Sequence, residues 1–240
     1  MHGLANPARF LRIARPLTPW LLGLGLALAG GALAWGLFAA PAERLQGETV
    51  RILYIHVPSA WLGMAGWTAI AGASLAEIVW RHPLAAIAGR AAALPGAVFT
   101  ALCLATGSLW GRPAWGTWWD WDGRLTSMLV LLFLYFGYIA LSSAAAREGS
   151  SSRIPALFGL FGVINVPVIH YSVLWWSSIH QPPSFSLGGS AMAAEFRTPL
   201  LVATLGFTLL FAAVVLMRMR ALLAEAQAEA RLRRRAREAG

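Results

Sequence analysis

Tryptophan and aspartate gather in one short segment of the chain, which reads WGTWWDWD. The segment contains Trp115, Trp118, Trp119 and Trp121 together with the carboxylates of Asp120 and Asp122. Each tryptophan presents a large flat surface with one polar N–H group. Four such rings beside acidic side chains exceed what a membrane anchor needs. The segment is therefore suited to a large, planar, apolar ligand with polar edges.

Imidazole side chains can join this aromatic surface. His56 precedes one apolar run, and His180 follows another, just before two prolines. Flat aromatic walls suit a porphyrin, imidazole nitrogens suit the axial positions of its iron, and arginines suit its propionates. The arginines in the same predicted loops are Arg51, Arg112, Arg124 and Arg197. These residue types indicate a haem site, with His170 as the second choice for the role of His180, because it lies about 15 Å deeper along a helix.

Each of these features also has an ordinary interpretation. A single interfacial histidine is more often structural than a ligand, and tryptophans at helix ends usually form an aromatic belt. That belt accounts for Trp35, Trp110, Trp175 and Trp176. It does not account for the tryptophan segment, because eight residues need one anchor rather than four. It also leaves the two carboxylates unexplained.

The composition places these residues in a membrane protein. Of the 240 residues, 58% are hydrophobic and 12% are charged, whereas a soluble domain carries about 25% charged residues. All 19 basic residues are arginine, and their positions follow membrane topology, so the net charge of +9 does not indicate nucleic-acid binding. The single cysteine, Cys103, excludes an internal disulfide and is expected to fill an apolar core position.

The apolar runs predict the elements that position the site. A helix needs roughly 20 apolar residues to cross a bilayer, and six such runs predict an all-α integral membrane protein, a bundle of six transmembrane helices. The predicted spans are residues 18–38, 57–80, 91–110, 126–145, 155–175 and 199–217. They form one membrane domain, 1–217, followed by a basic helical tail, 218–240.

Arginine positions predict the orientation of this bundle. An even number of spans puts both termini on one side, and 14 of the 19 arginines lie there. The positive-inside rule then predicts cytoplasmic termini and an outward-facing tryptophan loop at about 111–125. The first span is favoured as an uncleaved helix, because its apolar stretch exceeds the 7–15 residues typical of a signal peptide. In the tail, Glu229 and Arg233 have the favourable i,i+4 spacing of a solvated helix, and membrane lipid or a cytoplasmic partner stays an alternative contact for its basic face.

Three stretches carry a resemblance to known proteins. The segment WGTWWDWD followed by Gly123-Arg124-Leu125-Thr126 resembles the tryptophan-rich signature of haem-handling proteins of cytochrome c biogenesis. The stretches ILYIHVP (52–58) and HYSVLWW (170–176) resemble the CcmC family, the six-span haem exporter proteins of the bacterial maturation system I. The resemblance covers about residues 10–220. Asp120 departs from the family pattern, in which an apolar residue often stands between WW and WD.

The resemblance implies a multi-pass protein of the bacterial inner membrane that holds haem b, non-covalently and transiently, at the periplasmic face. It implies His56 and His180 as axial ligands of the haem iron and the tryptophan loop as the platform. The predicted haem-contacting residues are His56, His180, Trp115, Trp118, Trp119, Trp121, Asp122, Arg124 and Arg51. The implied partners are the haem chaperone CcmE, the ABC transporter CcmA/CcmB and the small protein CcmD. Because CcmE takes haem covalently on its own histidine, a transport and assembly factor is favoured over an enzyme.

Other functions stay open on the sequence alone. A permease path usually needs polar groups within the membrane, and only Glu77 and His170 qualify. A transmembrane electron carrier commonly needs haem ligands at two depths, and the inner side offers only His82. A scaffold without a ligand would use the tryptophan loop as a protein-docking surface.

Overall fold

The computed structural model describes residues 6–149, 151–176, 178, 180, 185–186, 189–190 and 192–238. Six of its helical segments are long and apolar enough to cross a membrane, which confirms the predicted all-α architecture. The helical elements are α1 (Pro7–Ala34) with the π-helical turn η1 (Trp35–Ala39), the 3-10 turn η2 (Glu48–Ile52), α2 (Leu53–Trp80), α3 (Ala85–Trp115), α4 (Gly123–Glu148), α5 (Arg153–Gly162), α6 (Asn165–Trp175) and α7 (Ala194–Glu238). Two short strands, β1 (Phe185–Ser186) and β2 (Gly189–Ser190), pair antiparallel before α7.

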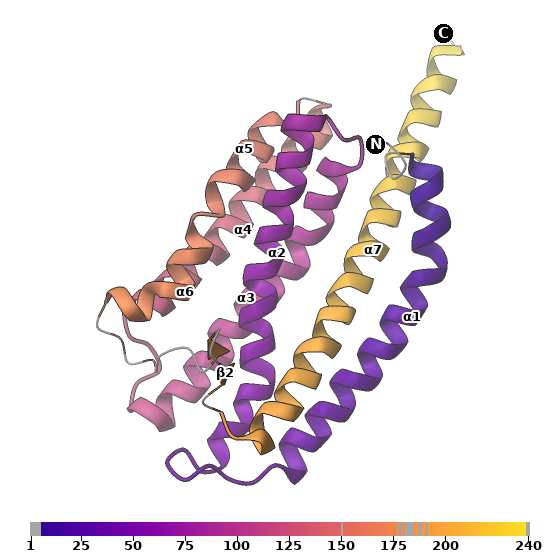
Figure 1. Ribbon diagram of the computed structural model, residues 1–240. Coiled ribbons are helices and arrows are strands. Elements are labelled where there is room, and N and C mark those ends of the chain that lie inside the picture. Colours follow the sequence, from indigo (N-terminus) through magenta and orange to yellow (C-terminus); the bar gives the residue numbers. More distant parts are fainter. Residues whose placement is uncertain are drawn as a thin grey trace.

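The helices form two groups (Figure 1). Helices α2 to α6 make one bundle, and α1 packs along α7 beside it. The first and last helical turns lie at one end of the molecule, while the α3–α4 connection and β2 lie at the opposite end. Helix α7 continues past the bundle at the end where the chain terminates. All the connections that carry the predicted site therefore meet at the end away from the termini.

The centre of the bundle is an aromatic cluster around Trp67 of α2, which is fully buried. Its ring meets those of Tyr135 and Tyr138 of α4 edge to face, with centroids 5.0 and 6.1 Å away. Gly162 ends α5 against the same indole, and a Cβ there would lie 2.3 Å from Trp67 Cζ2. Only glycine allows this approach, so the cluster joins α2, α4 and α5 without space for additional atoms.

The fifth predicted span is divided into α5 and α6 by a turn at residues 163–164. Pro167 explains the break, because a proline lacks the N–H donor and its ring clashes with the carbonyl four residues earlier, here that of Val163. The Asn165 side chain secures the second half by donating from Nδ2 to the Ser127 carbonyl of α4 at 2.9 Å.

The helix ends at the site differ from the sequence-based boundaries. Helix α3 continues to Trp115 and ends at Gly116, whose φ of +79° lies in the left-handed region that glycine tolerates. Helix α4 begins at Gly123, with Asp122 as its N-cap. The non-helical part of the tryptophan loop is thus residues 116–122. His56 lies within α2 rather than in a loop, because η2 leads directly into that helix.

Candidate functional site

The tryptophan loop was predicted at about 111–125, and its non-helical part is residues 116–122. Hydrogen bonds to backbone carbonyls hold this part in place. Ser108 of α3 donates to the Trp118 carbonyl at 2.8 Å, and Arg112 Nη1 donates to the Gly116 carbonyl at 2.8 Å. Thr117 Oγ1 donates to the Trp119 carbonyl, also at 2.8 Å. These bonds fix the loop backbone, and none of the three involves an indole N–H group.

The indole rings of the loop are largely uncovered. Trp118 is 54% exposed and Trp121 is 73% exposed, whereas Trp119 is half-buried. Trp119 and Trp121 meet edge to face with ring centroids 5.4 Å apart. The buried Nε1 of Trp119 has no hydrogen-bond partner among the described residues. The loop therefore presents a firm backbone with exposed aromatic surface, which is the form expected of a platform for a flat ligand.

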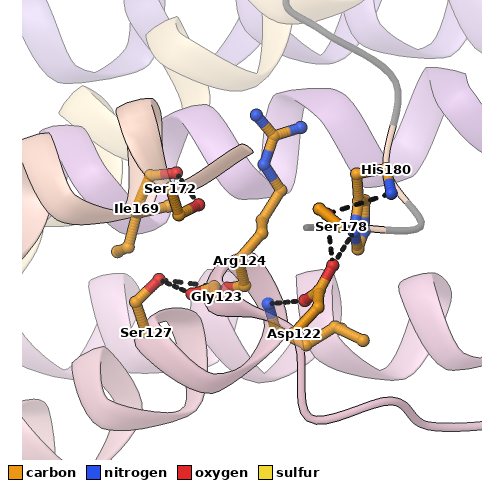
Figure 2. A network of polar contacts seen from close by, with 9 residues as sticks. Asp122, Gly123, Arg124, Ser127, Ile169, Ser172, Ser178 and His180 are labelled. Carbon is orange, nitrogen blue, oxygen red and sulfur yellow. Dashed lines mark hydrogen bonds and ion pairs between the residues drawn. The ribbon is translucent and has the colours of Figure 1, made fainter. Parts of the chain in front are cut away.

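Asp122 is the polar centre of the site (Figure 2). Its Oδ1 accepts from the Leu125 N–H at 2.8 Å and so caps α4. Its Oδ2 accepts from Ser178 Oγ at 2.5 Å and from His180 Nδ1 at 2.6 Å. The carboxylate is buried and ties Ser178 and His180, which follow α6, to the start of α4. One side chain thus positions both the tryptophan loop and a candidate ligand.

The protonation of this pair follows from its surroundings. Burial alone would raise the pKa of Asp122, but the hydrogen bonds from Ser178, Leu125 and His180 outweigh it and lower that pKa. Burial also lowers the pKa of His180, more than the Asp122 carboxylate raises it. The contact therefore joins an ionised carboxylate to a neutral imidazole at neutral pH, and Nδ1–H is the donor. A neutral imidazole is the form that binds metal.

His56 lies in the first turn of α2 against the C-terminal part of α3. Its Nδ1 is 3.0 Å from Thr106 Oγ1, and its ring meets that of Trp110 edge-on at 5.7 Å. The absence of a side chain at Gly107 makes room for the ring, because a Cβ there would lie 3.0 Å from His56 Cε1. Trp110 is in turn fixed by donating from Nε1 to Gln46 Oε1 at 2.9 Å. Helix α3 therefore forms the wall behind this imidazole.

The two predicted ligands belong to one end of the molecule and share α3 as a support. Trp115, the last residue of α3, lies against His180 with ring centroids 4.8 Å apart. His56 is within electrostatic range of both His180 and Arg124. The guanidinium of Arg124 points away from Asp122 in Figure 2 and has no hydrogen-bond or ion-pair partner within the described part of the chain. A half-buried, unpaired cation beside two imidazoles suits an anionic group of a ligand.

Two of the predicted residues lie outside this cluster. Arg51 donates from Nη1 to the carbonyls of Gly36, at 3.1 Å, and Leu37, and it also contacts Glu48. It thereby ties η2 to the end of the first span. His170 is exposed on α6, where its ring contacts only the neighbouring Tyr171 among the described residues.

A cavity of about 570 Å³ adjoins the site between α4 and α6. Trp121, Asp122 and Trp176 line it near the tryptophan loop, and it extends along α4 and α6 to Val130 and Asn165. This volume is within the range of roughly 300–1,000 Å³ that small-molecule sites occupy. The Thr126 hydroxyl on its wall is buried and has no partner among the described residues.

Sequence patterns alone did not reveal the residues that support the imidazoles. Thr106, Gly107 and Trp110 follow one face of α3 at helical spacing, a signal visible in the sequence only once His56 is known to pack there. Asp122 and His180 are 58 positions apart in the sequence. The sequence after α6 has no helical or strand periodicity that would predict where His180 lies. Asp122 was predicted as a haem-contacting residue, and its contact with His180 was not predicted.

Comparisons with known proteins agree with one another. The model of the family described as haem exporter protein C, CcmC, matches residues 1–234. A haem exporter protein C of Bradyrhizobium diazoefficiens is 49% identical over 221 residues, which cover 90% of this chain and 82% of the relative. Proteins of the same name from Escherichia coli and Paracoccus denitrificans are 43% and 40% identical, with 93% and 90% of this chain covered and 90% of each relative.

Proposed function

The chain belongs to the CcmC family of haem exporter proteins, and we propose that it holds haem between His56 and His180 beside the tryptophan loop. Haem is the cargo, bound without a covalent link and released to a partner. The observation that carries this proposal is the pair of supported imidazoles at one end of the bundle, each with Nδ1 engaged by the protein. Their Nε2 atoms are left to bind iron.

The number of ligands favours haem over a bare metal ion. The described residues contain no group of three or more His, Cys, Asp or Glu side chains that could hold a metal. Two imidazoles suit a metal that brings its own equatorial ligands, as haem iron does. The exposed rings of Trp118 and Trp121 supply apolar surface for the macrocycle. Arg124, which has no ion-pair partner among the described residues, suits a propionate.

We further propose the cellular setting that the family resemblance implies. The chain lies in the bacterial inner membrane with both termini in the cytoplasm and its site facing the periplasm. It receives haem b with the help of CcmA, CcmB and CcmD and presents it to CcmE for cytochrome c maturation. The open aromatic surface supports transfer, since a sealed pocket would hinder release. Holding the haem edge near the histidine of CcmE would accelerate covalent attachment by positioning.

The structure offers a matched set of variants for the test. His56→Ala and His180→Ala are each expected to reduce the haem retained by the detergent-purified chain and to shift its Soret band. His170→Ala is the control, because this histidine is exposed and lies apart from the cluster. Unchanged haem content and spectrum in both of the first two variants would refute the ligand assignment. A loss of haem confined to His170→Ala would instead identify His170, which lies deeper along the helix, as the second ligand.

A further inference from the structure

Thr106 determines which nitrogen of His56 carries hydrogen. Its Oγ1 lies 2.7 Å from the Leu102 carbonyl and 3.0 Å from His56 Nδ1. A threonine hydroxyl has one hydrogen to donate. If that hydrogen pointed to Nδ1, Oγ1 and the Leu102 oxygen would face each other at 2.7 Å with no proton between them. The hydroxyl therefore donates to the carbonyl, and Oγ1 accepts from His56 Nδ1–H.

The same tautomer is reached at His180 by a different partner. An ionised carboxylate can only accept, so the 2.6 Å contact to Asp122 Oδ2 places hydrogen on His180 Nδ1. In both rings the lone pair is then on Nε2. No hydrogen bond within the described ranges engages either Nε2. The two imidazoles are therefore prepared for a metal before any cargo arrives.

The two supports differ in strength. A hydrogen bond to a carboxylate is charge-assisted and stronger than one to a neutral hydroxyl. A carboxylate on the distal N–H also makes an imidazole a more basic ligand. His180 has this carboxylate, with Ser178 reinforcing it at 2.5 Å. Among the described residues, His56 Nδ1 has only neutral groups beside it, the Thr106 hydroxyl at 3.0 Å and the more distant Cys103 thiol at 3.9 Å.

We propose that Thr106 is a positioning residue that holds His56 in the Nδ1–H tautomer with Nε2 as the ligating atom, and that its neutral hydroxyl makes His56 the weaker of two unequal axial ligands. The ligand role rests on the haem function proposed above. The tautomer is a property of the haem-free chain and can be tested separately. Unequal ligands suit a carrier, because one bond can break while the other still holds the cargo.

The tautomer is read by two-bond ¹H–¹⁵N correlation spectra of the haem-free chain in detergent, with ¹⁵N-labelled histidine. His56 is expected to show hydrogen on Nδ1 in the unmodified chain and in Thr106→Ser, which keeps the hydroxyl. Thr106→Val is expected to shift the population toward Nε2–H. An Nε2–H tautomer at His56 in the unmodified chain would overturn the proposal, whatever the chain does with haem.

The ligand strength is read by titrating the same variants with haem. Thr106→Val is expected to weaken haem affinity by roughly 10–100-fold, the usual effect of losing such a support, and Thr106→Ser by much less. Thr100→Val is the control, because Thr100 makes the same bond to the carbonyl four residues earlier, at 2.8 Å to Gly96, without contacting a histidine. Equal losses in Thr106→Val and Thr100→Val would reduce Thr106 to a helix-packing residue and overturn the proposal.

The inequality is tested by comparing the two ligand variants. His180→Ala is expected to lose more haem affinity than His56→Ala, by about tenfold or more, and the opposite order would overturn the inequality. If the spectra show Nδ1–H at His56 but neither variant changes haem binding, the proposed function fails while the tautomer assignment stands. If haem binding depends on both histidines but His56 carries Nε2–H, the function stands and this inference fails.

Discussion

Tryptophan serves two opposite purposes in this chain. Trp67, at the centre of the bundle, is fully buried, and its ring contacts three other aromatic rings. Trp118 and Trp121, in the loop at the end away from the termini, expose more than half of their surface. The loop backbone is fixed by hydrogen bonds that do not involve these two indoles. The same side chain therefore stabilises the fold in one place and is held ready for contact in the other.

This difference indicates which substitutions should change the stability of the fold and which should change haem binding. Around Trp67, glycines such as Gly162 bring helices so close that no added atom fits, so any change there disturbs packing. In the tryptophan loop, the exposed rings of Trp118 and Trp121 can be removed without leaving a cavity. Changes in the core should affect unfolding first, and changes in the loop should affect haem binding first.

The largest effect is expected at Trp67. Trp67→Ala should lower the free energy of unfolding by about 3–5 kcal/mol, because it leaves a cavity where three rings now pack. Trp67→Phe should cost clearly less, since it keeps an aromatic ring. Unfolding in mixed micelles with increasing SDS measures both. A loss below about 1 kcal/mol for Trp67→Ala, the typical cost of an average substitution, would contradict the comparison.

The next effect is expected at Asp122. Asp122→Asn keeps an N-cap for α4, because asparagine caps as well as aspartate. It removes the carboxylate from His180 and should weaken haem affinity about 10–100-fold with little change in unfolding. The neighbouring Asp120→Asn is the control, as no hydrogen bond or ion pair of its carboxylate occurs among the described residues. Equal losses in the two variants would indicate a general charge effect.

A smaller effect is expected from the exposed indoles. Trp118→Ala and Trp121→Ala should each weaken haem binding by about 0.5–1.5 kcal/mol, the contribution of one aromatic contact. The free energy of unfolding should stay within about 0.5 kcal/mol. Haem titration and SDS unfolding of the same preparations separate these outcomes. A large loss of stability with unchanged haem binding would reverse the proposed division between core and loop.

The smallest effect is expected far from both regions. Glu229 and Arg233 form the predicted i,i+4 ion pair at 3.5 Å, and both side chains are more than half exposed. Glu229→Gln should change stability by at most about 0.3–0.5 kcal/mol, as for other exposed helix pairs, and leave haem binding unchanged. A thermal melt that moved by several degrees would show that the tail packs against something.

Much of the fold followed from the sequence because lipid imposes a simple rule. A span must be apolar and about 20 residues long, and the six runs that meet this rule became six spanning segments. The division of the fifth span was not predicted, because the run stays apolar across the turn before Asn165. The C-terminal end of the third span was predicted at residue 110, and α3 continues to Trp115, since a helix can extend beyond the hydrocarbon without an apolar sequence.

The site was harder to predict because its contacts join distant segments. The grouping of histidines and tryptophans at one end followed from the membrane level of their loops. The partner of His180 did not, because a hydrogen bond to Asp122 depends on where His180 lies in three dimensions, 58 positions further along the chain. Arg51 was predicted at the haem edge from its charge and loop. Its bonds to the carbonyls of Gly36 and Leu37 depend on where the first span ends.

Helix α7 carries a cluster of positive charge away from the helical bundle. It is a single helix of 45 residues, roughly 67 Å long at 1.5 Å per residue. Its apolar part ends at Arg218, which donates to the Ala91 carbonyl at 3.0 Å, and Arg233 lies roughly 22 Å further along the axis. The side chains from residue 224 to residue 238 are exposed. The five arginines between residues 231 and 237 are thus carried well beyond Leu223, the last buried residue of α7.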